Sequence, residues 1–133
     1  MDKKALVLKT FNKQLTEFID DVNAIFPGEK DVVLLSTFMK TIMFGKPRAI
    51  IEVWYENITL KYYEQIENGE LEYFLNKDYS EDLQDSPGSA ESLQAINSLR
   101  SSIRKAFELD INKEKTLKYV QNITKLANIY YNN

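Results

Sequence analysis

Carboxylates are the side chains in this sequence best suited to catalytic chemistry, and they gather in the middle of the chain. The 133 residues include no His and no Cys, which excludes imidazole catalysis, thiol nucleophiles and zinc sites built on those ligands. Glu64 and Glu67 have the spacing of half a helical carboxylate metal site, but the His that completes a di-iron set is absent. We therefore expect no catalytic residue, no metal site and no cofactor.

The acidic residues belong to a strongly negative segment between two mildly basic ones. Residues 1–48 carry eight Lys and Arg against six Asp and Glu, residues 49–93 carry two against eleven, and residues 94–133 carry seven against three. Such a segment can pair with the basic ends of the same chain, orient the protein on a basic partner, or form a solvated face. These three interpretations stay open from the sequence alone.

Paired tyrosines add a second signal for partner binding. Two neighbouring residues cannot both face inward from a straight helix, so one tyrosine of each pair at 62–63 and 130–131 is expected outside the core. Exposed aromatic side chains beside charge are common anchors of protein interfaces. The predicted protein-binding residues are Tyr63, Glu64, Glu67, Glu70, Glu72, Tyr79 and Tyr131.

Basic residues near the C-terminal end allow a different function. They recur along one side of two expected helices and are interleaved with tyrosines, a pattern that can bind phosphates and stack bases. The sequence pI of about 5.1 argues against it. The alternative nucleic-acid-binding residues are Arg100, Arg104, Lys105, Lys115, Lys118 and Lys125.

Apolar spacing predicts the helices that would position these residues. Over 4–25, apolar residues recur three or four apart, as in a helix packed lengthwise against others, and Pro27 and Gly28 end it. A third helix is expected over 47–67, ending at Asn68 and Gly69. Between them, a helix over 31–44 is expected to face inward with Val32, Leu35, Phe38, Met39, Ile42 and Met43.

A short helical turn at about 70–76 and helices over 90–109 and 113–131 complete the pattern. No stretch of about 18 apolar residues occurs, so we expect no membrane insertion. The predicted fold is all-α: a compact bundle of five main helices plus one short helix, forming a single domain over 1–133, with a flexible loop around 84–89.

Several short stretches resemble a group of short helical proteins of nucleocytoplasmic large DNA viruses, most of them uncharacterised. The stretches lie between residues 10 and 83, and they are FNKQL (11–15), FIDD (18–21), IFP (25–27), YEQIENGELEYFL (63–75) and KDY (77–79). None of them is a catalytic motif. The resemblance implies a viral protein made in an infected cell, located in the host cytoplasm or in the virion.

The sequence thus predicts a non-enzymatic structural or adaptor protein that acts through protein–protein contacts, with itself or virion components as partners. Nucleic-acid binding through the basic residues is the alternative. The two hypotheses differ in their expected salt dependence, because contacts with phosphates weaken steeply as the salt concentration rises.

Overall fold

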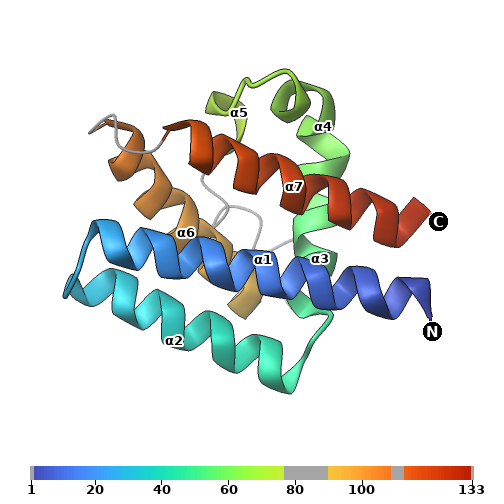
Figure 1. Cartoon of the computed structure of the whole chain (residues 1–133), viewed down its shortest axis with the longest axis horizontal. Helices are drawn as coiled ribbons and strands as arrows, with labels where there is room; N and C mark the ends of the chain where they lie inside the picture. The colour runs from blue at the N-terminus through green and yellow to red at the C-terminus, as the bar shows by residue number, and fades with distance from the viewer. Residues whose placement is uncertain (1, 77–89, 109–112, 133) are drawn as a thin grey trace.

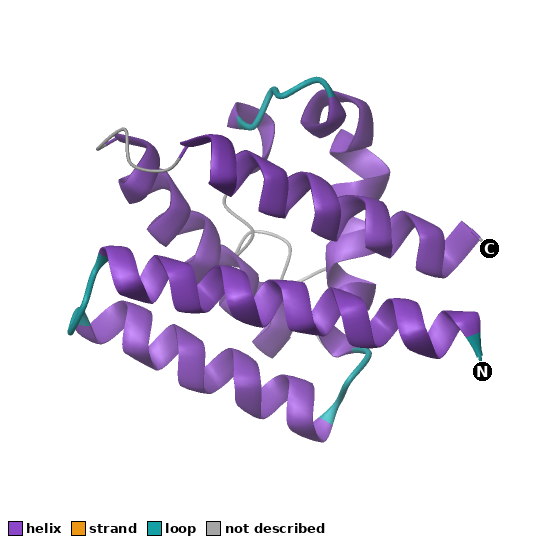
Figure 2. Cartoon of the chain, viewed as in Figure 1, coloured by secondary structure: helices purple, strands orange, loops and turns teal. Residues whose placement is uncertain are grey.

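The computed structural model describes residues 2–76, 90–108 and 113–132, which form helices joined by turns (Figures 1 and 2). No strand occurs in these ranges. Five longer helices and one short helix are present in them, so the predicted all-α fold is confirmed. The loop predicted around 84–89 and the predicted binding residue Tyr79 lie outside the described residues.

The first two helices run antiparallel, side by side (Figure 1). Helix α1 spans Lys3–Ile25, and its first turn is capped by Asp2, whose carboxylate accepts a hydrogen bond from the Lys4 backbone N–H at 3.0 Å. Helix α2 spans Lys30–Gly45. Between them Gly28 has a φ of 77°, a conformation that favours glycine. Both helices match their predicted bounds to within one residue.

The third long helix is continuous but irregular. Helix α3 (Ala49–Trp54) passes into a π-helical turn, η1 (Tyr55–Thr59), and then into α4 (Leu60–Glu67), within which Tyr62 has a φ of −131°. The sequence predicts a regular helix over 47–67, and the π turn is therefore a correction to it. A π-helical turn contains one residue more than an α-helical turn, so it rotates every following residue relative to the preceding ones.

The spacing of the buried residues explains the π turn. Ile50, Trp54, Ile58 and Ile66 are all fully buried. Ile50 and Ile66 are 16 positions apart, which on a regular α-helix would point them about 160° away from each other. The extra residue of η1 removes much of that offset, roughly 100°, and keeps both residues in the core.

The remaining helices complete the core. They are α5 (Glu72–Leu75), α6 (Ala90–Glu108) and α7 (Lys113–Asn132). Helix α7 lies along α1, while α6 packs against α2 and α3 (Figure 1). All helices contribute to one hydrophobic cluster, and Trp54 is its largest fully buried side chain. In the part of the chain that the structure describes, no helix is both long enough and apolar enough to cross a membrane.

Candidate protein-binding surfaces

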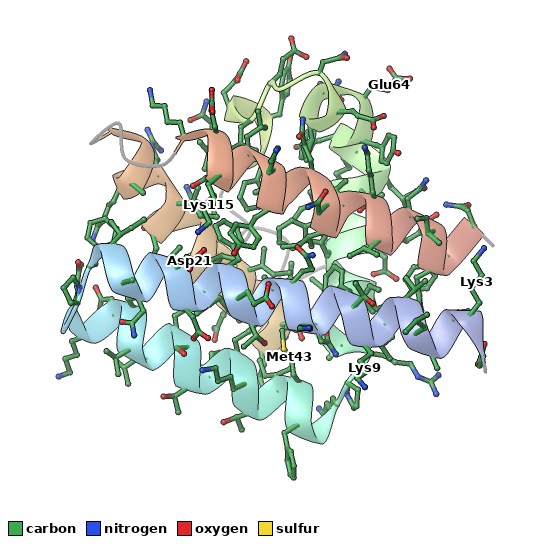
Figure 3. The ribbon with its side chains drawn as sticks, viewed as in Figure 1. Lys3, Lys9, Asp21, Met43, Glu64 and Lys115 are labelled. Carbon is green, nitrogen blue, oxygen red and sulfur yellow. The ribbon has the colours of Figure 1, made fainter. Side chains whose placement is uncertain are left out.

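The predicted acidic residues lie at the corner where α4 turns toward α5. Glu64, Glu67, Glu70 and Glu72 are all exposed, and Glu64 points away from the bundle (Figure 3). Within the described ranges, no three acidic side chains gather closely enough to hold a metal ion. Glu67 instead forms an ion pair with Lys125 of α7 at 3.1 Å. Among the described residues, the corner is therefore an exposed acidic surface.

Two of the predicted tyrosine anchors, Tyr63 and Tyr131, each lie near Tyr55 of η1. Tyr63 is half-buried and lines a groove of about 480 Å³ between the third helix and α7, together with Glu64 and Tyr55. The ring of Tyr131 stacks on that of Tyr55, with centroids 4.4 Å apart. The pKa of Tyr131 is raised to about 12, mainly because the hydroxyl is buried and secondly because of the negative charge of Glu52. Tyr131 is therefore mainly part of the fold, although its edge is exposed.

The predicted basic residues are largely engaged with other helices. The guanidinium of Arg100 donates to the Leu75 carbonyl oxygen at the end of α5 at 3.0 Å. Arg104 and Lys118 are exposed on α6 and α7. Each of the other three pairs with an acid on another part of the chain: Lys105 with Glu29 at 3.1 Å, Lys115 with Asp21 at 2.9 Å, and Lys125 with Glu67 at 3.1 Å. These pairs leave fewer cations for phosphate groups than the sequence predicts.

One of these pairs belongs to a polar cluster that joins α1 to α7. The Asp21 carboxylate accepts a hydrogen bond from the Tyr119 hydroxyl at 2.8 Å and pairs with Lys115, which it faces across the helices (Figure 3). The Tyr119 ring stacks on Phe18, with centroids 4.8 Å apart. Hydrogen bonds from Lys115 and Tyr119 lower the pKa of Asp21. The pKa of Tyr119 is raised to about 12, mainly because the hydroxyl is buried and secondly because it donates a hydrogen bond to Asp21.

We expect the Asp21 cluster to stabilise the fold in a pH-dependent way. Because the folded-state pKa of Asp21 is lowered, its contribution is present above the unfolded pKa of about 4 and is lost as the pH falls through the folded value. Asp21→Asn should reduce the free energy of unfolding at pH 7 by up to about 1 kcal/mol. Urea unfolding at several pH values should show this difference shrinking below about pH 4.

Two further variants check the cause. Lys115→Gln should also lower the stability at pH 7, since it removes the cation that pairs with Asp21. Lys118→Gln, an exposed change on the same helix, should leave the pH profile of the wild type unchanged. An Asp21→Asn difference that stays constant from pH 7 to pH 2 would contradict the assignment of the effect to the charged carboxylate.

The surface that sequence reasoning missed is the outer face of α2. Phe44 is 92% exposed and Leu34 is 56% exposed, and Val33 and Phe38 of the same helix are exposed as well. The sequence predicts Phe38 inside, so this assignment is wrong. Leu35, Met39 and Ile42 face the core as expected, and Phe38 lies at the flank of that buried stripe. No other helix covers the opposite side of α2 in the described part of the chain (Figure 1).

A groove adjoins this face where α2 meets α6. Its volume is about 440 Å³, with Asp31, Leu34, Leu35 and Phe38 on the α2 side and Ser98, Ser101, Ser102 and Lys105 on the α6 side. The sequence contains a usable signal for this surface: Val32 to Leu35 are four consecutive apolar residues, which cover most of the circumference of a helix and cannot all face one core.

Comparisons with models of protein families, with curated proteins and with solved structures find no match to this chain.

Proposed function

We propose that this chain is a non-enzymatic structural or adaptor protein, and that it acts through protein–protein contacts made by the outer face of α2. The observation that carries the proposal is the group of large apolar side chains that this one helix leaves exposed: Val33, Leu34, Phe38 and Phe44. Contiguous apolar patches on otherwise polar proteins are typical of interaction sites.

Energetics favours a partner on this face. Burying a side chain the size of leucine or phenylalanine contributes about 1.5–3 kcal/mol. Phe44 and Leu34 are the most exposed of the four and would contribute most. Lys40, on the same helix, pairs with Asp20 of α1 at 3.2 Å, so a partner that covers Lys40 would meet a paired charge and not a lone one.

The acidic corner around Glu64 and Glu70 is a secondary part of the proposal. Its exposed charge would steer a basic partner and speed its approach more than it would strengthen binding. The resemblance to helical proteins of large DNA viruses supports a viral protein, with the host cytoplasm or the virion as its location. Virion components are then among the partners that the α2 face would contact.

Site-specific photocrosslinking tests the proposed docking face. A photoreactive phenylalanine analogue placed at Phe44 should form adducts with other polypeptide chains in cells that express the protein. The matched control is the same analogue at Leu6, an apolar residue of α1 that is 49% exposed. Adducts should form at position 44 and not at position 6. Equal yields at the two positions would contradict a specific role for α2.

A further inference from the structure

We propose that the partner of the α2 face is a second copy of this chain, and that the two α2 helices pack antiparallel about a two-fold axis. This inference rests on the proposed function and names the occupant of the same surface. A two-fold interface needs a patch that is complementary to itself, because residue i of one copy contacts residue j of the other and the reverse.

The spacing of the outer residues meets this requirement. Leu34, Thr37, Thr41 and Phe44 follow each other at intervals of three, four and three, and the sequence places them on one face of α2. In an antiparallel pair whose axis passes near residue 39, Leu34 lies opposite Phe44 of the other copy. The same register sets Thr37 opposite Thr41, so one alignment matches all four positions.

At the centre of this face, Thr41 is compatible with a dry contact. The Thr41 hydroxyl donates to the Thr37 carbonyl oxygen at 2.8 Å, so this polar group is satisfied within its own helix. A threonine whose hydroxyl is already bonded can leave water at little cost, since the penalty for burying a polar group arises when it lacks a partner.

The groove between α2 and α6 offers a seat for the most exposed side chain. Leu34 borders this groove, and the register places Phe44 of the second copy opposite Leu34. The α6 side of the groove carries serines, whose small side chains leave room for a ring, while Leu35 and Phe38 supply apolar contact. Because of the two-fold axis, both Phe44 side chains would be seated in the same way.

Charge complements the same register. Asp31 is exposed in the first turn of α2, and Lys46 is exposed directly after its last residue. In this register Asp31 of one copy lies opposite position 47 of the other, next to Lys46, twice in the dimer. The antiparallel arrangement also places the positive N-terminal end of one helix dipole beside the negative C-terminal end of the other. A parallel arrangement would oppose like charges at both ends.

The size of the face sets the expected strength. A helix of 16 residues offers a face about 24 Å long and about 10 Å wide. That face is roughly 240 Å² per copy, well below the roughly 800 Å² per partner of a standard specific interface. We therefore expect a weak, reversible dimer that forms only at about 100 μM and above. Sedimentation equilibrium of the purified full chain over a concentration series measures this directly.

Two matched variants identify the surface. Phe44→Glu should weaken dimerisation more than about tenfold, because the dimer would bury two unpaired charges. Leu60→Glu introduces the same charge on another helix and should leave the dimer unchanged. Circular dichroism melts establish that both variants are folded. A Phe44→Glu variant that dimerises like the wild type would overturn the proposal.

A charge exchange tests the antiparallel geometry. Asp31→Lys and Lys46→Glu should each weaken the dimer, by up to roughly fivefold per ion pair, because each places like charges opposite one another. The double variant should restore the affinity, since the pairs are then reversed. Weakening by both single variants without restoration in the double variant would overturn this register.

The outcome for the purified protein is separate from that of the photocrosslinking experiment. A chain that stays monomeric at all concentrations overturns self-association through α2. If the analogue at Phe44 still forms adducts with a different polypeptide in cells, the docking function survives and its partner is another protein.

Discussion

Trp54→Ala should lower the free energy of unfolding by about 3–5 kcal/mol, a large fraction of the stability of a domain of this size. Trp54 is fully buried at the centre of the core. Its ring lies edge-on to Phe11, with centroids 6.4 Å apart, and tilted against Phe74 at 5.4 Å. The loss would therefore loosen contacts from α1 and α5 as well as leaving a cavity. Chemical denaturation followed by circular dichroism measures the change.

The polar contact of Trp54 can be tested separately. Its indole N–H donates to the Thr124 hydroxyl at 3.1 Å. Thr124→Val keeps the size of the side chain but leaves that N–H without its partner, which should cost about 1–3 kcal/mol. Thr10→Val is a matched control, because the Thr10 hydroxyl bonds only to its own helix near the surface. A loss below about 1 kcal/mol for Trp54→Ala would contradict the central role of this residue.

Deleting Glu56 should preserve the fold, whereas deleting Glu17 should abolish it. Glu56 is an exposed residue of the π turn, which already contains one residue more than an α-helical turn. Its removal can convert η1 into regular helix and shorten the step from Trp54 to Ile58 to three residues. The buried positions then keep a spacing of three or four, so we expect a loss of about 0.5–3 kcal/mol.

Glu17 is also exposed, but it lies in the regular helix α1. Its deletion would rotate the preceding part of the helix by about 100° and turn Phe11 and Leu15 away from the core. Each lost core side chain costs about 2–5 kcal/mol, and the sum approaches the whole stability of the domain. Circular dichroism and thermal melts of both deletion variants decide this. If the two deletion variants are destabilised equally, the interpretation of η1 as a turn with one removable extra residue is wrong.

The regular parts of the fold could be predicted from spacing alone. In α1, Phe11, Leu15, Phe18 and Val22 recur at intervals that keep one face inward, and all four are buried. Gly28 and Gly69 mark the turns where the backbone takes a positive φ. These features depend only on neighbouring residues, which is why the sequence was sufficient for them.

The irregular parts depend on neighbours that are distant in the sequence. The spacing of apolar residues in α2 predicts that Phe38 faces the core. The packing of α1 and α6 against α2 determines which of its residues are buried, and Phe38 lies at the edge of the buried side. The π turn has a visible signal in the repeated spacing of four from Ile50 to Ile66, which a regular helix cannot keep on one face.

The candidate site was the least predictable feature. Lys105 and Lys115 have the spacing of a basic face, yet each pairs with an acid tens of residues away. Lys105 pairs with Glu29, directly before α2, and Lys115 pairs with Asp21 of α1. Such pairs arise when helices that are distant in sequence come together, and no local pattern encodes them. The acidic corner is exposed, because Glu64 and Glu70 lie where the chain changes direction.

The burial of Trp54 provides an optical probe of the core. It is the single tryptophan of the chain and is fully shielded from solvent. Its fluorescence emission should shift to longer wavelength only when the core opens, and every unfolding experiment described above that retains Trp54 can be followed without a label. Association through the exposed face of α2 should leave that emission unchanged, so one spectrum separates assembly from loss of structure.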